Sequence, residues 1–162
     1  MKPKITFVLT GGTIDKEYDA LDKAFTIGST AVSRILTNIK PNFDTTIIPL
    51  LQKVSVNITD EEKELIYKTC AEAPNEKIIL TYGTDAMTEI AERLKDVKGK
   101  IIVIVGALKS QLIKDTDAEF NLGAAVAAVQ TVLPGVYIAM NGRIYAAGTC
   151  RKDLETGQFV DA

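Results

Sequence analysis

Hydroxyl and carboxylate side chains stand beside glycine in two short stretches of this sequence. One stretch reads Thr10-Gly11-Gly12-Thr13 and the other reads Tyr82-Gly83-Thr84-Asp85. A threonine hydroxyl becomes a nucleophile when a neighbouring base takes its proton, and backbone N–H groups beside glycine can bind a developing oxyanion. Both stretches are therefore candidates for nucleophilic catalysis. The alternative is that both are ordinary turns between a strand and a helix, in which threonine only caps the helix.

Histidine is absent from the sequence. Its absence excludes a Ser-His-Asp or Cys-His triad within the chain and any zinc site that needs imidazole. P-loop and G-x-G-x-x-G patterns are absent as well, and we expect neither a metal nor a cofactor. Proton transfer must then use lysine, aspartate, glutamate or tyrosine. A lysine beside an aspartate is better suited to holding and relaying a proton than to acting as a free amine.

The composition is that of an ordinary globular protein. The 162 residues carry a net charge of −2 and 46% hydrophobic residues, so we expect one domain over residues 1–162 and no surface for nucleic acid or membrane. Residues 1–4 lead directly into the first apolar run, and no signal peptide is expected. Cys70 and Cys150 lack metal or redox spacing and are expected to be reduced, as in a cytoplasmic protein.

Apolar runs alternate with helical patterns along the chain. Strands are predicted at residues 5–10, 45–50, 77–81, 100–105 and 135–140, and helices at 29–38, 59–73, 86–94 and 120–132. Ser29 is the expected N-cap of the first helix, and Thr59 with Glu62 forms a capping box for the second. Asn141-Gly142 predicts a type I′ hairpin that leads into an antiparallel strand at 143–146.

This alternation predicts an α/β fold with a doubly wound, mostly parallel, flavodoxin-like (Rossmann-like) sheet and a C-terminal antiparallel hairpin. The first and third strands are neighbours in that order, so the two glycine-threonine turns should meet in one crevice at the carboxyl ends of the strands. Residues 14–27 are interpreted as a surface loop of the length used for lids. Residues 51–58 are also read as a loop, and residues 147–162 as a mostly polar tail without periodicity.

The motifs resemble those of the bacterial-type L-asparaginases. The segment Thr10-Gly11-Gly12-Thr13-Ile14 is similar to their first signature, and Tyr82-Gly83-Thr84-Asp85-Ala86-Met87 is similar to their second, usually His-Gly-Thr-Asp-Thr-Met. Three further segments match in the same order: Ile104-Val105-Gly106-Ala107-Leu108, Phe120-Asn121-Leu122 and Ala139-Met140-Asn141. The resemblance covers nearly all of the chain.

The resemblance implies hydrolysis of a side-chain amide through a threonyl ester. It makes Thr13 the nucleophile, assisted by a loop tyrosine. The commonest position of that tyrosine falls near Phe25, and Tyr18 is the better candidate. A second set, which manages the proton, maps to Thr84, Asp85 and Lys152.

Substrate binding is implied at other positions. Gly12 and Gly83 form the turns around the substrate, and Asp85 holds its α-ammonium group. Ser55 and Asn57 lie where the family holds the α-carboxylate. A turn before the next helix is an equally good account of Asn57.

The sequence also departs from the family pattern. Family members usually carry a second, C-terminal domain that completes the neighbouring subunit's site, so we expect a short, single-domain member that forms a homodimer or higher homo-oligomer. Tyr82 replaces the usual histidine and Ala86 the usual threonine. The expected function is hydrolysis of L-asparagine in the cytoplasm. Glutamine or another small amide is the alternative substrate, and a non-catalytic amino-acid-binding module is the alternative of another class.

Overall fold

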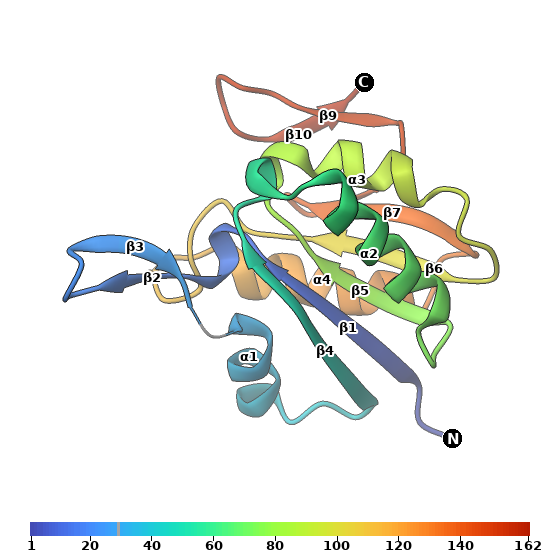
Figure 1. The fold of residues 1–162 in the computed structure, drawn as a ribbon. Coiled ribbons are helices and arrows are strands. Elements are labelled where there is room, and N and C mark those ends of the chain that lie inside the picture. The colour runs from blue at the N-terminus through green and yellow to red at the C-terminus, as the bar shows by residue number, and fades with distance from the viewer. Residues whose placement is uncertain (29) are drawn as a thin grey trace.

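A six-stranded sheet forms the centre of the computed structural model, which describes residues 1–28 and 30–162 (Figure 1). Across the sheet the strands are β4 (Asp44–Lys53), β1 (Lys4–Gly11), β5 (Lys77–Thr81), β6 (Ile101–Val105), β7 (Gly135–Met140) and β8 (Arg143–Ala146). The first five pair in parallel and β8 is antiparallel to β7. The parallel strands thus follow the flavodoxin-like order, with β1 and β5 as neighbours, and the predicted fold class is confirmed.

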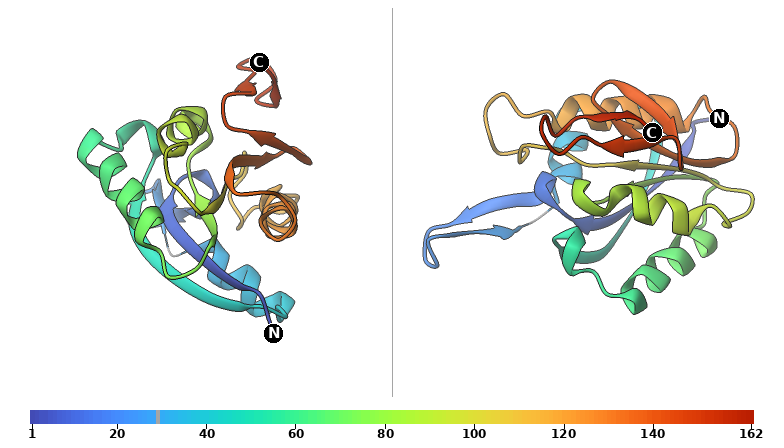
Figure 2. Two further views of the ribbon diagram at one scale, coloured as in Figure 1. Left: turned by 90° about the vertical axis from the view of Figure 1, so that its right-hand side faces the viewer. Right: turned by 90° about the horizontal axis from the view of Figure 1, so that it is seen from above.

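In the described part of the chain, four α-helices cover the sheet, two on each face (Figure 2). They are α1 (Ala31–Ile39), α2 (Asp60–Glu72), α3 (Met87–Leu94) and α4 (Ala118–Val129). Helices α2 and α3 pack on one face of the central strands and α1 and α4 on the other. Strands β5 and β6 are therefore buried on both faces, which accounts for their continuous isoleucine, leucine and valine runs. Among the described residues, no helix is long and apolar enough to cross a membrane.

Side chains close in the sequence cap the N-termini of α1 and α2. Thr59 accepts a hydrogen bond from the Glu62 N–H, and the Glu62 carboxylate accepts one from the Thr59 N–H, so the predicted capping box is confirmed. At α1 the cap is Thr30, whose hydroxyl accepts from the Val32 N–H at 3.2 Å. Ser29, the expected cap of this helix, lies outside the described residues.

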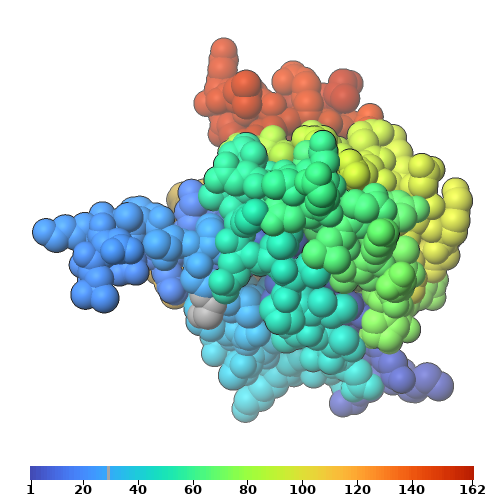
Figure 3. All heavy atoms as spheres, in the orientation of Figure 1, coloured from blue at the N-terminus to red at the C-terminus, as the bar shows by residue number. Residues whose placement is uncertain are grey.

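The prediction of a loop over residues 14–27 was wrong. After a 3₁₀ turn (Thr13–Asp15) the chain forms a β-hairpin of β2 (Lys16–Asp19) and β3 (Ala24–Ile27). Tyr18 pairs with Phe25 across the two strands, and their rings meet edge to face at 5.6 Å. The Asp19 carboxylate accepts from the Leu21 and Asp22 N–H groups and closes the turn. The hairpin projects from the body of the protein (Figure 3).

Residues 147–162, read as a mostly polar tail without periodicity, contain a second hairpin. Strand β9 (Cys150–Lys152) pairs with β10 (Phe159–Asp161) in antiparallel register. Phe159 is buried in the same core as α3, and its carbonyl oxygen accepts from the Tyr145 hydroxyl at 2.7 Å. Arg143 donates two hydrogen bonds to the Asp161 carboxylate, at 2.9 and 2.8 Å. These contacts fix the hairpin against β8, although its own strands are short.

Candidate functional site

The carboxyl ends of β4, β1 and β5 are joined by polar contacts. The Thr10 hydroxyl donates to the Thr81 carbonyl oxygen at 2.6 Å, and the Thr10 N–H donates to the Thr81 hydroxyl at 3.2 Å. On the other side of β1, the Gly12 N–H donates to the Lys53 carbonyl oxygen at 2.9 Å. The two glycine-threonine turns and the segment after β4 therefore leave the sheet side by side, as the predicted strand order requires.

Gly12, Gly83 and Ser55 meet at this edge of the sheet. Gly12 has a φ of +89°, and a Cβ there would lie 2.9 Å from the Gly83 Cα atom. A Cβ on Gly83 would in turn lie 2.4 Å from the Ser55 Oγ atom. Only glycine allows the three backbones to approach this closely. Three of the residues predicted to surround the substrate are thus brought together, although they come from three different strand ends.

Replacing Gly83 with alanine is expected to lower the free energy of unfolding by about 1–3 kcal/mol, because the new methyl group overpacks the turn against Ser55. Gly123→Ala is the matched control, since Gly123 lies in α4 and a Cβ there would meet no atom within 4 Å. That control should raise the free energy of unfolding by about 0.5–1 kcal/mol. Denaturant unfolding of both variants measures the difference, and equal stabilities would contradict the close approach at Gly83.

Thr84, Asp85 and Lys152 form a hydrogen-bonded group. The Lys152 Nζ atom lies 2.9 Å from the Thr84 Oγ1 atom and 2.6 Å from the Asp85 Oδ1 atom. Thr84 is buried, the Lys152 side chain is 19% exposed, and the Asp85 side chain is 59% exposed. As an ammonium group Lys152 can donate to both oxygens, which links a buried hydroxyl to a carboxylate that faces solvent.

Lys152 reaches this group from the hairpin of β9 and β10. Its position depends on the register Phe159↔Lys152, on the burial of Phe159, and on the hydrogen bond from the Phe159 N–H to the Asn141 Oδ1 atom at 2.8 Å. In the sequence, Lys152 is assigned to the site by family resemblance alone, and the strand that carries it, β9, was not predicted. The two apolar residues Phe159 and Val160 were the available signal for β10, the strand that pairs with it.

Thr13 opens the 3₁₀ turn directly after β1 and is partly buried. Tyr18 lies further along, on the projecting hairpin, where its side chain is 58% exposed. Its ring lines a pocket of about 410 Å³ between the hairpin and residues 110–113. Asn57 is exposed at the end of a 3₁₀ turn (Ser55–Asn57). The structure thus groups Gly12, Gly83 and Ser55 and joins Thr84, Asp85 and Lys152, whereas Tyr18 stands apart on the hairpin.

Two buried hydroxyl groups near the turns lack partners among the described residues. The Ser55 side chain is 2% exposed, and its Oγ atom has no hydrogen-bond partner there. The Tyr82 hydroxyl is likewise buried and unpartnered in the part of the chain that the structure describes. Burial, reinforced by the charge of Glu89, raises the pKa of Tyr82 to about 12. Tyr82 therefore stays neutral at ordinary pH and packs in the core below the turn.

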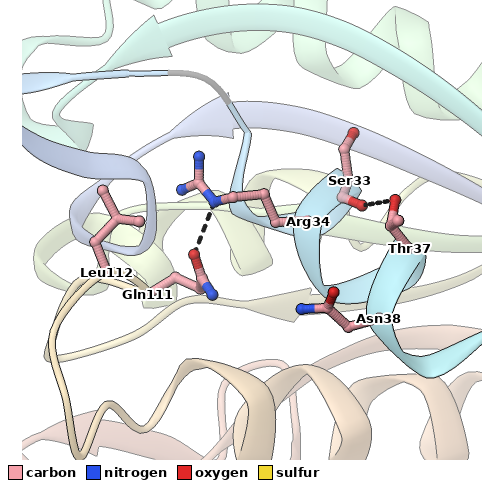
Figure 4. Close-up of a pocket in the computed structure, with 6 residues that line it drawn as sticks. All are labelled: Ser33, Arg34, Thr37, Asn38, Gln111 and Leu112. Atoms are coloured by element: carbon pink, nitrogen blue, oxygen red, sulfur yellow. Dashed lines mark hydrogen bonds between the residues drawn. The ribbon is translucent and has the colours of Figure 1, made fainter.

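A separate surface pocket of about 390 Å³ lies between α1 and the loop after β6 (Figure 4). It is lined by Ser33, Arg34, Thr37, Asn38, Gln111 and Leu112. None of these was predicted as a site residue. The residues that the sequence singled out lie at the strand ends and do not line this pocket.

The sequence and the fold are similar to those of known proteins. A family model described as "Asparaginase, N-terminal" matches residues 4–158. The fold is similar to that of a probable cytoplasmic L-asparaginase from Campylobacter jejuni, with a TM-score of 0.84, 28% identity, and coverage of 99% of this chain and 53% of that one. It is also similar to the thermostable L-asparaginase from Thermococcus kodakarensis, with a TM-score of 0.82, 21% identity, and coverage of 98% and 51%.

Curated relatives carry a different name. A glutamyl-tRNA(Gln) amidotransferase subunit from Methanococcus vannielii is 34% identical over 152 residues, which cover 86% of this chain and 34% of that protein. The corresponding subunit from Methanococcus maripaludis is 33% identical over 150 residues, which cover 85% and 35%. This chain spans about a third of the length of these relatives. Because the family model covers residues 4–158, the chain belongs to the asparaginase family, in the region of its N-terminal domain.

Proposed function

We propose that this domain hydrolyses the side-chain amide of L-asparagine, with Thr13 as the nucleophile. One observation carries the proposal. The Lys152 Nζ atom contacts both the Thr84 Oγ1 and the Asp85 Oδ1 atoms, at 2.9 and 2.6 Å, beside the turn that follows Gly83. A binding module has no need of an ammonium group between a buried hydroxyl and a carboxylate. A hydrolase that lacks histidine needs such a group to move a proton.

The proposed reaction has two stages. In the first, the Thr13 Oγ atom attacks the amide carbon, and backbone N–H groups after Gly12 and Gly83 stabilise the oxyanion. The proton lost by the hydroxyl passes to the leaving nitrogen, and ammonia departs from a threonyl ester. In the second stage water attacks the ester, the Thr84–Lys152–Asp85 group takes up and returns the proton, and aspartate is released with the Thr13 hydroxyl restored. The reaction consumes one water and requires no cofactor.

The surrounding residues suit an amino-acid substrate. The unpartnered Ser55 hydroxyl, which is buried beside Gly83, could donate to the α-carboxylate. The half-exposed Asp85 carboxylate could accept from the α-ammonium group while it stays paired with Lys152. Asn57 stands at the exposed rim and is proposed as a further contact. The negative α-carboxylate and the positive α-ammonium group of the substrate would thus each have a partner, Ser55 and Asp85.

Tyr18 is proposed to assist Thr13 when the hairpin of β2 and β3 closes over the substrate. In this structure the hairpin projects from the protein, and Tyr18 is largely exposed beside Phe25. A second copy of the chain is the proposed partner that limits this movement and closes the open side of the crevice. The proposed active form is therefore a homo-oligomer in which Tyr18 assists Thr13.

A second candidate function is hydrolysis of glutamine. The names of the curated relatives favour it, since they describe a subunit of an amidotransferase that acts on glutamyl-tRNA(Gln). Glutamine differs from asparagine by one methylene group, for which a pocket discriminates by only about 1–3 kcal/mol. The alternative of another class is an amino-acid-binding module without turnover.

Ammonia release by the purified protein separates these functions. We expect kcat/KM for asparagine to exceed that for glutamine about tenfold or more, in line with one methylene group. The reverse preference would make glutamine the substrate. Asparagine binding detected by calorimetry, with no ammonia from either amide, would replace the enzyme with a binding module. Thr84→Val, assayed beside the wild type, tests whether any turnover belongs to this site.

A further inference from the structure

We infer that Asp15 is a positioning residue for Thr13, because its carboxylate anchors the turn that carries Thr13 to the start of α1. The inference rests on the proposed role of Thr13 as the nucleophile. Asp15 lies two residues after Thr13, at the end of the 3₁₀ turn, and is only 3% exposed. It belongs to neither of the two residue groups described at the strand ends.

Asp15 is held at all three of its polar groups. Its N–H donates to the Gly12 carbonyl oxygen at 3.2 Å, and its carbonyl oxygen accepts from the Gly28 N–H at 2.9 Å. Its side-chain Oδ1 atom accepts a hydrogen bond at 2.5 Å from the N–H of Ala31, which is the first residue of α1. The first two bonds close the turn and the base of the hairpin. The third connects both to the helix.

A second connection runs from the same turn to the same helix. The Gln111 N–H donates to the Ile14 carbonyl oxygen at 3.1 Å, and the Arg34 Nε atom of α1 donates to the Gln111 Oε1 atom at 2.8 Å (Figure 4). The turn, the loop after β6 and α1 therefore form a closed triangle of hydrogen bonds. The Asp15 carboxylate supplies the direct side of that triangle, adjacent to Thr13 in the chain.

Opposing effects act on the Asp15 carboxyl, and its pKa is raised. Burial raises the pKa of Asp15, while the Ala31 N–H and the positive charge of Arg34 act in the opposite direction. A helix N-terminus is a favourable place for the charge, but Thr30 already caps α1 through the Val32 N–H. Thr30 and Asp15 thus satisfy different N–H groups of the same helix start, those of Val32 and Ala31. What Asp15 adds is the attachment of the Thr13 turn.

Asp15→Ala, Asp15→Asn and Thr30→Ala test this role together. Because a small displacement of a reacting group costs on the order of 100-fold in rate, Asp15→Ala should lower kcat for asparagine by about 10- to 100-fold. KM should change by less, since Asp15 lies outside the proposed substrate contacts. Asp15→Asn keeps an oxygen acceptor for the Ala31 N–H and should restore kcat to within about threefold of the wild type. Thr30→Ala removes the other cap of the same helix and should leave kcat unchanged.

Amide hydrogen exchange provides a readout that does not depend on turnover. In Asp15→Ala, the Gly28 and Gln111 amides should lose protection relative to Thr30→Ala, because both donate to the anchored turn. Equal kcat losses in Asp15→Ala and Thr30→Ala, or unchanged protection in Asp15→Ala, would overturn the inference. Asp15→Ser replaces Asp15→Ala if the latter does not fold. A wild-type protein without turnover would count against the proposed function alone, and amide exchange would then decide whether Asp15 fixes the turn.

Discussion

Replacing Thr13 with alanine is expected to lower kcat for ammonia release from asparagine by about 1,000-fold or more, the scale seen when a nucleophilic hydroxyl is removed from a hydrolase. The reason is that the threonyl ester can no longer form. Alanine also offers no group that could activate a water molecule to attack the amide directly. Thr13 is partly buried and stands at the end of a strand, so truncation removes few core contacts. The fold should persist, and thermal unfolding measured beside the assay checks this.

Thr13→Ser is the matched variant for this experiment. It keeps the hydroxyl and removes only a methyl group, so it should retain turnover that Thr13→Ala lacks. Mass spectrometry after rapid mixing with asparagine should detect the acyl ester on the wild type and on Thr13→Ser. Full ammonia release by Thr13→Ala in a clean preparation would assign the nucleophile to another residue.

Lys152→Met should lower kcat by about 100- to 10,000-fold, the range for loss of a positioned proton-transfer group. Methionine keeps the apolar stem but leaves the Thr84 hydroxyl and the Asp85 carboxylate without the ammonium group that joins them at 2.9 and 2.6 Å. Because Asp85 is also the proposed contact of the α-ammonium group, KM should change as well. Initial rates over a range of asparagine concentrations separate the two effects.

Arg151→Met is the control for the lysine experiment. Arg151 precedes Lys152 on β9, is exposed, and points to the opposite side of the strand, as successive strand residues do. The substitution removes one positive charge from the same hairpin and leaves the Thr84–Lys152–Asp85 group intact. Comparable losses of kcat in the two variants would mean that the charge of the hairpin, rather than the contacts of Lys152, supports turnover.

Elements with a strong local signal were predictable from the sequence. The strands at β5, β7 and β8 have the boundaries that the apolar runs and the Asn141-Gly142 turn indicated. The capping box at Thr59 was also readable, because both of its bonds lie within four residues. In each case the interactions that define the element come from neighbours in the chain, so the local pattern is sufficient.

The two missed hairpins depend on distant contacts instead. Strands β2, β3, β9 and β10 have only three or four residues each, too few for a pattern of period two to appear. The second hairpin is held by Tyr145 and Arg143 through bonds to Phe159 and Asp161. The anchoring of Asp15 at Ala31, 16 positions later, was hidden for the same reason. Contacts between residues that are far apart in the chain determine the structure of these segments, and such contacts cannot be read from a single sequence.

The place of Lys152 in the chain has a consequence for when the site becomes complete. Lys152 follows all six strands of the central sheet, and it meets Thr84 across a separation of 68 positions. As the chain is synthesised from its N-terminus, the strands that carry the Thr13 and Thr84 turns emerge from the ribosome before β9 does. The Thr13 turn and the Thr84 turn can thus leave the ribosome while the lysine is still inside it. Chemical competence would then arise in one late step, when the last hairpin docks through Phe159.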